Sequence, residues 1–448
     1  MIDRLFHISE NGTTVRTEII AGITTFMTMS YIIFLQPAVL SKANMDFGAV
    51  MTATCIASAI GTFLMGIMAN YPVAMAPAMG HNFFFAFMVC GPVAMGGLGY
   101  PWEIALGANF LAGALFIIIS KWGVREMIMV SIPSSLKHGI AVGIGLLIAF
   151  LGLQWGGLVV SAPATYVKMG DLGSAPALVT IIGIVITAIL MARNIKGAIF
   201  WGIIAGAIAA IPFGVINFSG KIVSSPPSLS STFLKLNVID LFTQPDFFIV
   251  ILILFFLAVF DTVGTLVGVG ERAGLMKDGR LPRARQALLA DAIGTTAGTL
   301  LGTSTITSYI ESTAGVSVGG RTGFANIITG ILFLLALFFS PIVRIIGGGY
   351  ETSDGLLLHP ITSPALIIVG SLMLQSVKHI SWNDITEGLP AFLTIIMMQF
   401  TFSITEGIAF GCISYSLLKI VSGKGKDAHF IVHLLAILFA IRYIFLKS

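Results

Sequence analysis

Two short stretches decide the fold of this chain: VAMAPAMGHNFFFAF at residues 73–87 and TSTITSYIESTAGVSVGG at residues 303–320. Neither is long enough to cross a bilayer as a plain helix once its polar, helix-breaking part is removed, because a spanning helix needs about 20 residues. Residues 303–307 alternate with β-branched residues, as a short strand does, and Pro72 and Pro77 bracket the extended part of the first stretch. We therefore predict a strand followed by a half-helix in each stretch. Irregular backbone at membrane depth is tolerated only where it lines a cavity or packs in protein.

Long apolar runs make up most of the remaining chain. Of the 448 residues, 56% are hydrophobic and only 10% are charged, whereas a soluble domain carries about 25% charged residues. This composition excludes a soluble enzyme, a disordered chain, a coiled coil and a nucleic-acid-binding protein. It predicts an all-α polytopic membrane protein with about 14 transmembrane segments. The expected spans are residues 18–40, 49–70, 74–88, 102–120, 134–155, 175–192, 197–217, 247–270, 287–301, 306–318, 322–345, 363–377, 387–402 and 404–421.

The basic residues set the orientation of these spans. Most of the 24 Lys and Arg residues fall on the side of the N-terminus when the spans are counted along the chain, so the N-terminus is expected to be cytoplasmic and the protein to lie in the cell inner (plasma) membrane. The polar N-terminal stretch lacks the features of a signal peptide. The final run, residues 429–446, is interrupted by His433 and Arg442. It either spans or lies at the interface, and we favour an interfacial helix over 423–448.

The two halves of the chain resemble each other. AIGT at residues 59–62 recurs at 292–295, which is 233 residues later, and APALVTII at 175–182 recurs as LPAFLTII at 389–396. These matches predict a duplication of about seven spans, and because seven is odd the second copy would be inverted. The same offset superimposes the two short stretches. Inverted repeats are common in secondary transporters, where interrupted helices in corresponding places mark a substrate site near the midplane.

Carboxylates within the predicted spans are functional candidates, because charged side chains are costly in a bilayer. The deep ones are Asp261 in span 247–270, Asp291 in span 287–301 and Glu311 in the second short stretch. We assign Asp261 and Glu311 to substrate binding and proton coupling, since both lie on elements that the repeat selects. For Asp291 we favour a structural hydrogen bond to a neighbouring helix. Burial in a structural hydrogen bond is the alternative for the other two.

Four further side chains complete the candidate substrate site. Asn82 offers an amide at the matching depth in the first short stretch, and Thr28 lies opposite Asp261 by the repeat offset. His81 is a ligand contact, a proton relay or a packed histidine, and packing is the reading we favour. Phe83 is one of three consecutive phenylalanines that either pack in the core or face a planar ligand.

Two buried carboxylates repel anions and suit a cation or a neutral solute with N–H donors. A carboxyl group that exchanges a proton as the site opens to each side couples transport to the proton gradient, and sodium stays open as the coupling ion. An ionised carboxylate accepts two N–H bonds from a heterocycle edge, and an amide donates and accepts at another edge. This combination fits a planar nucleobase. The alternative is an anion exchanger of the same architecture; an enzyme is disfavoured because no metal-ligand set or nucleophile motif is present, and no cofactor is expected.

Several segments together resemble the AzgA-like purine permeases of the nucleobase:cation symporter class. These are APAMGHNFFFAF, FDTVGTLVGVGERAGL, GTSTITSYIESTAGVSVGGRTG, the N-terminal NGTTVRTEIIAGITTFMTMSYIIFLQP and the late FSITEGIAFGCISYSLLK. The resemblance covers nearly the whole chain. It implies proton-coupled uptake of adenine, guanine or hypoxanthine, with binding positions at Asn82, Asp261 and Glu311.

The resemblance also implies a division into two domains. A core domain would comprise residues 1–120 and 247–345, and a gate domain residues 121–246 and 346–422, through which similar proteins often form homodimers. One departure concerns the site. Where family members usually have another residue before Asn-Ala-Phe-Phe-Ala, this chain has His81 before Asn82 and Phe83 in place of a small residue. These two side chains would alter purine preference or pH dependence.

Overall fold

The computed structural model describes residues 2–93, 96–122, 133–216, 220–276, 281–352 and 355–445. Its helices in the first part of the chain are α1 (Ile2–Phe6), α2 (Val15–Met29), α3 (Ile32–Leu40), η1 (Ser41–Ala43), α4 (Phe47–Leu64), η2 (Met65–Ala69), α5 (Met79–Phe83), η3 (Phe84–Val89), α6 (Trp102–Trp122), α8 (Ser134–Trp155), α9 (Ala175–Ala192) and α10 (Ala198–Ala210). Those in the second part are η5 (Asp240–Thr243), α11 (Phe247–Arg272), α12 (Ala284–Leu301), η6 (Ile310–Ser312), α13 (Thr313–Ser317), α14 (Phe324–Ala336), η7 (Leu337–Phe339), α15 (Ser340–Gly347), α16 (Ser363–Met373), η8 (Leu374–His379), α17 (Ile385–Phe400), α18 (Ile404–Val421), η9 (Gly425–Asp427) and α19 (Phe430–Phe445).

The fold is mostly helical and suited to a bilayer. Eight helical segments in the described ranges are long and apolar enough to cross a membrane, and four further apolar helices are shorter. A multi-pass membrane protein is therefore confirmed, whereas about 14 spans arranged as an inverted repeat stays a prediction. The expected spans 175–192 and 404–421 coincide with α9 and α18. Residue 217 of the expected span 197–217 and residues 446–448 of the C-terminal helix lie outside the described residues.

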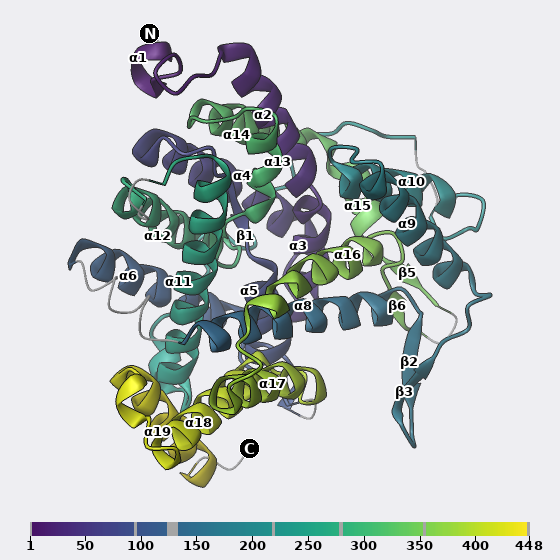
Figure 1. Cartoon of the computed structure of the whole chain (residues 1–448). Coiled ribbons are helices and arrows are strands. Elements are labelled where there is room, and N and C mark those ends of the chain that lie inside the picture. Colours follow the sequence, from purple (N-terminus) through teal and green to yellow (C-terminus); the bar gives the residue numbers. More distant parts are fainter. Residues whose placement is uncertain are drawn as a thin grey trace.

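Both predicted short strands are present, and they pair with each other. β1 (Met75–Pro77) and β4 (Ile306–Ser308) form an antiparallel pair in which Met75 lies opposite Ser308. The half-helix α5 follows β1, and η6 and α13 follow β4. In Figure 1 this pair lies among α4, α11 and α12 in the middle of the molecule. The residues of both strands are buried, so the irregular backbone is enclosed by protein.

Helices α4 and α12 cross beneath this strand pair at two glycines. A Cβ at Gly294 would lie 3.4 Å from the Cα of Gly61 and 3.1 Å from Met75 Cε, so the two glycines let the helices and the strand pair pack closely. One threonine on each helix then binds a strand: Thr62 donates to the Met75 carbonyl at 3.0 Å and Thr295 to the Ile306 carbonyl at 2.7 Å. The four helix residues are pairwise 233 positions apart, the spacing found in the sequence.

The helices form two packed groups. The first joins α2, α3, α4, α6, α11, α12 and α14 around the strand pair, and the second joins α8, α9, α10, α16, α17, α18 and α19. Figure 1 shows α17, α18 and α19 at the lower end of the molecule and α9 and α10 at its right. Helix α5 contacts α8, so the first short stretch lies where the two groups meet.

Three features differ from the sequence prediction. Strands β2 (Val159–Ala162) and β3 (Tyr166–Met169) form an exposed hairpin that projects at the lower right of Figure 1, and β5 (Tyr350–Glu351) pairs with β6 (Leu357–Leu358). The all-α description is therefore too simple. The expected span 18–40 is also not one helix, because it breaks between α2 and α3 at Ser30 and Tyr31.

Candidate functional site

One segment, residues 303–311, contacts two of the polar residues on which the site hypothesis depends and contains the third. Ser304 donates to the side-chain carbonyl of Asn82. Thr307 Oγ1 donates to Asp261 Oδ2 at 3.0 Å, and Glu311 Oε1 accepts from the Tyr31 hydroxyl at 2.7 Å. The structure thus places Asn82, Asp261 and Glu311 in this order along the segment.

Glu311 is anchored by the broken first span. Tyr31, in the break between α2 and α3, binds its carboxylate, and Thr28 Oγ1 donates to its backbone carbonyl at 3.3 Å. Thr28, which corresponds to Asp261 by the repeat offset, also donates to the Thr25 carbonyl at 2.8 Å, and it lies about one helical turn from Tyr31 on the same face. The predicted candidate Thr28 therefore lies beside the second carboxylate.

Asp261 faces an opening beside α11. Its side chain is exposed, and a Cβ at Gly264, one turn further along α11, would meet nothing within 4 Å. Ile310, which precedes Glu311, is 49% exposed although its neighbours in β4 are buried. Three exposed residues, Asp261, Gly264 and Ile310, therefore lie next to buried segments, and we call the space beside them the opening.

Asn82 has a different setting from the two carboxylates. Its side chain is fully buried, and Ser304, which donates to it, also accepts from Gln36 Nε2 at 2.9 Å. Gln36 Nε2 lies 3.0 Å from Thr303 Oγ1 as well. In this conformation the amide of Asn82 connects the half-helix α5 to residues 303–304 through hydrogen bonds.

His81 and Phe83 are both buried in α5. His81 is buried, and its Nε2 has no hydrogen-bond partner within the described part of the chain. Phe83 stacks on Phe87 with ring centroids 5.7 Å apart, and both rings lie edge-on or tilted to Trp155 of α8.

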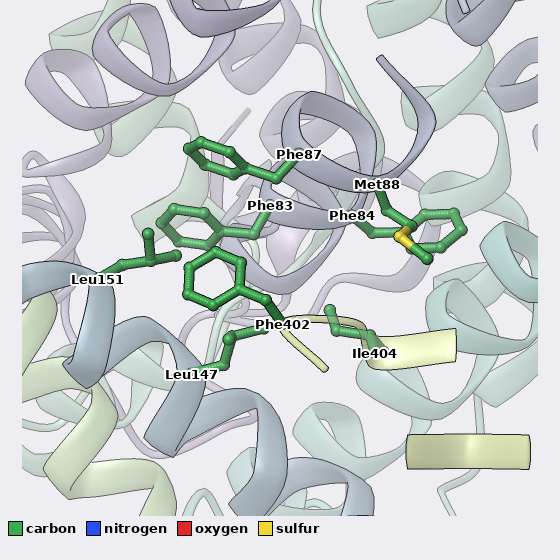
Figure 2. A pocket seen from close by; sticks show the side chains of 8 residues that line it. All are labelled: Phe83, Phe84, Phe87, Met88, Leu147, Leu151, Phe402 and Ile404. Carbon is green, nitrogen blue, oxygen red and sulfur yellow. The ribbon is translucent and has the colours of Figure 1, made fainter. Parts of the chain in front are cut away.

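Phe83 also lines an apolar pocket where the two helix groups meet. Figure 2 shows its lining residues, which are Phe83, Phe84, Phe87 and Met88 from the first short stretch, Leu147 and Leu151 from α8, and Phe402 and Ile404 from the α17–α18 connection. No carboxylate lines this pocket. It is therefore a hydrophobic contact zone next to the polar site and separate from it.

Asp291 takes the structural position expected for it. Its Oδ2 accepts hydrogen bonds from Thr262 Oγ1 of α11 at 2.7 Å and from the Ser308 backbone N–H at 3.0 Å. This carboxylate therefore joins α12, α11 and β4. Within the described ranges, neither Asp291 nor Asp261 nor Glu311 forms an ion pair, and no group of three potential metal ligands occurs. In a low-dielectric region, such carboxylates need a proton or a ligand's donors.

Three residues of the site region, Tyr31, Thr307 and Trp155, were not expected from the sequence. Tyr31 carried a usable signal, because it follows the candidate Thr28 by three residues and shares its helical face. Thr307 belongs to the alternating stretch that predicted a strand. Trp155 ends an apolar run and carried no signal, since its role depends on contacts with Phe83 and Phe87 from a distant part of the chain.

A strand pair, two half-helices and carboxylates without an ion-pair partner in the described residues together form the candidate site. A family model described as "Permease family" (Xan_ur_permease) matches residues 16–410. The chain belongs to this permease family. This permease is 45% identical over 453 residues to the guanine/hypoxanthine permease PbuG of Bacillus subtilis, with 99% of each chain covered. It is 42% identical over 451 residues to the adenine permease AdeP of Escherichia coli, covering 100% of this chain and 97% of that one.

These relatives confirm the resemblance to purine permeases. The chain is also 33% identical over 405 residues to the nucleobase transporter PlAzg2 of Paenibacillus larvae, covering 90% of this chain and 77% of that one. Among solved structures, the transmembrane domain of the cyanobacterial bicarbonate transporter BicA superimposes with a TM-score of 0.65 at 15% identity, covering 88% of this chain and 97% of that one. At this identity the likeness concerns the fold alone.

Proposed function

We propose that this permease imports a purine nucleobase (adenine, guanine or hypoxanthine) together with a proton by alternating access. The observation that carries the proposal is the placement of two carboxylates, Asp261 against β4 and Glu311 directly after it, beside exposed residues and with no cationic partner in the described part of the chain. The names of the relatives, adenine and guanine/hypoxanthine permeases, support the purine as substrate.

The chemistry of the site suits a planar base with N–H donors. Glu311 has one oxygen bound to Tyr31, which leaves the other to accept an N–H from the base edge. Asp261 is bound through Oδ2 to Thr307 and faces the opening, so it exchanges a proton with water and couples the base to the proton gradient. Asn82 orients the segment that carries both contacts.

Alternating access would move the two helix groups against each other. In this proposal the core is residues 1–120 and 247–345 and the gate is residues 121–246 and 346–422, with the apolar pocket of Figure 2 at their contact. The paired glycines and threonines 233 residues apart support an inverted 7+7 repeat around the strands. We further propose an inner (plasma) membrane location, a cytoplasmic N-terminus, an interfacial C-terminal helix and a homodimer through the gate.

Uptake in cells that lack their own purine permeases tests the proposal. Labelled adenine, guanine, hypoxanthine, xanthine and uracil are supplied with and without an uncoupler, and with sodium replaced by choline. We expect Asp261→Ala and Glu311→Ala to abolish purine uptake while still reaching the membrane, because each removes a group with no substitute in the site. Glu351→Ala, which removes an exposed carboxylate on β5, is the control.

Two outcomes would contradict the proposal. Normal uptake by either site variant would show that this residue is not needed for transport. Uptake that is unaffected by the uncoupler but requires sodium would show that sodium, and not the proton, is the coupling ion. An anion exchanger is the second candidate, because one structural neighbour is described as a bicarbonate transporter. Bicarbonate uptake in place of purine uptake would establish it, but unpaired carboxylates in the site oppose anion binding.

A further inference from the structure

We infer that Tyr31 is a positioning residue for the substrate: its hydroxyl fixes Glu311 so that one carboxylate oxygen is presented to an N–H of the purine. The inference rests on the proposed function and extends it to a residue outside the sequence-derived site. Tyr31 O–H donates to Glu311 Oε1 at 2.7 Å, across 280 residues of chain. Within the described residues, no other side chain donates to this carboxylate.

The backbone around Tyr31 is arranged for this contact. The residue is only 2% exposed and lies in the break between α2 and α3, where the Ser30 N–H still reaches the Phe26 carbonyl at 2.8 Å and a new helix begins at Ile32. Both Ser30 and Tyr31 keep helical dihedrals, so Tyr31 stays on the same face as Thr28, toward η6. Its ring centroid lies 6.5 Å from that of Tyr309, which limits sideways movement.

Glu311 is fixed on its backbone side as well. Thr28 donates to its carbonyl at 3.3 Å, and the neighbouring Ser312 Oγ accepts from the Ala74 N–H at 3.0 Å. With the backbone held by both halves of the chain, the carboxylate retains mainly its own side-chain torsions. The Tyr31 hydroxyl removes that freedom at Oε1, and Oε2 is left for a ligand entering beside the exposed Ile310.

The choice of partner distinguishes a positioning role for Tyr31 from a hydrogen bond that only compensates the burial of its hydroxyl group. A buried tyrosine hydroxyl normally finds a partner, and a backbone carbonyl serves, as Pro77 does for Tyr309. Tyr31 instead uses the charged group that the substrate needs. A loose carboxylate would have to be ordered at the moment of binding, and pre-ordering it lowers the cost of binding.

Transport and binding by the full-length permease test the inference. We expect Tyr31→Phe to raise KM for purine uptake about tenfold, the effect of losing one hydrogen bond to a charged group, with Vmax changed less than about twofold. The matched control is Tyr415→Phe, which removes a hydroxyl that lies 3.1 Å from Glu387 Oε1 in the gate helices. Its KM should equal that of the wild type once the amount of protein in the membrane is accounted for.

Purine analogues that each lack one N–H provide the second readout. In the purified wild-type permease, the analogue missing the N–H that Glu311 accepts should bind about tenfold more weakly than its parent base. In Glu311→Gln and in Tyr31→Phe this difference should shrink to within about threefold, because the acceptor is lost or no longer positioned. A purely structural Tyr31 would weaken the parent base and all analogues equally.

Failure of the inference is distinguishable from failure of the proposed function. If Glu311→Gln changes the analogue pattern while Tyr31→Phe leaves both KM and the pattern unchanged, the role of Tyr31 is overturned and the purine site stands. If Glu311→Gln changes neither the affinity nor the pattern for any of these bases, the proposed site itself is wrong.

Discussion

Several buried polar side chains are bonded to backbone atoms from the other half of the chain. Asn326 Nδ2 donates to the carbonyls of Tyr71 and Val73 at 3.0 and 2.7 Å, and Glu18 Oε1 accepts from the Arg321 N–H at 2.8 Å. Non-helical backbone within a membrane needs such partners, because no water is there to replace them. The composition predicts that buried polar groups exist. It does not predict their partners, since each lies some 250 to 300 residues away.

At the residue scale, one carboxylate outside the spans makes a pH-dependent contribution to stability. Asp384 caps α17, accepting from the Thr386 hydroxyl at 2.8 Å and from its N–H at 2.9 Å, and these bonds lower the pKa of Asp384. Because the pKa of this carboxyl is lower in the folded state, its ionised form stabilises the fold at any pH above the unfolded pKa of about 4. This contribution to stability is lost as the pH falls through the folded-state pKa. We expect Asp384→Ala to lower the Tm at pH 7, with the difference shrinking below about pH 4.

Thermal unfolding of the purified permease in detergent, followed by circular dichroism, measures this difference across the pH range. Asp171→Ala removes another exposed carboxylate, in the loop before α9, and serves as the control. A Tm difference for Asp384→Ala that is constant from pH 7 to pH 3 would contradict the capping role.

At the element scale, the sequence predicted what depends on local pattern and missed what depends on distant contacts. Helix α9 coincides with its expected span because a nearly continuous apolar run follows Ser174, and α18 begins as expected because the Ser403 side chain accepts from the Glu406 N–H. The expected strand 303–307 is displaced by one to three residues from β4, and its pairing with β1 follows the 233-residue repeat. The break at Ser30 and Tyr31 lies in a stretch that contains threonines but no Pro or Gly next to the break, so no strong local signal marks it.

The sequence GRTG at residues 320–323, which begins at the last residue of the second short stretch, ends in a glycine that close packing requires. Gly323, the first residue before α14, packs against Gly66 of η2 so closely that a Cβ would lie 2.1 Å from the Gly66 carbonyl oxygen. We expect Gly323→Ala to reduce sharply the yield of monodisperse protein, because backbone on both sides must shift. Gly264→Ala is the matched control, since a Cβ there meets nothing within 4 Å.

Size-exclusion profiles of the solubilised variants, together with their Tm, check this pair. Transport is not the readout, because Gly264 lies beside Asp261. Equal yield and Tm for the two variants would show that the contact of η2 with the start of α14 is not tightly constrained.

At the scale of the whole molecule, one cluster of aromatic rings lies where the two helix groups meet. Trp155 at the end of α8 packs against Phe83 and Phe87, its ring lies 4.6 Å from that of His359, and Lys42 Nζ lies 5.6 Å from its centroid. If the N-terminus is cytoplasmic, as the basic residues predict, this cluster lies toward the outside, whereas the exposed Gly264 of α11 lies toward the cytoplasm. We therefore predict that this conformation is closed to the outside and open to the cytoplasm.

This asymmetry predicts sided access to the site. The thiol introduced by Gly264→Cys, in a Cys90→Ser background that leaves the buried Cys55 and Cys412, should react with a membrane-impermeant maleimide much faster in inside-out vesicles than in intact cells. Adding Trp155→Ala should raise labelling in intact cells, because it removes the ring that Phe83, Phe87 and Lys42 contact. Trp201→Ala, on the exposed side of α10, is the control and should leave labelling unchanged. Equal labelling from both faces in the parent, or faster labelling from outside, would refute this assignment of the closed side, because the aromatic cluster would then not separate Asp261 from the external medium.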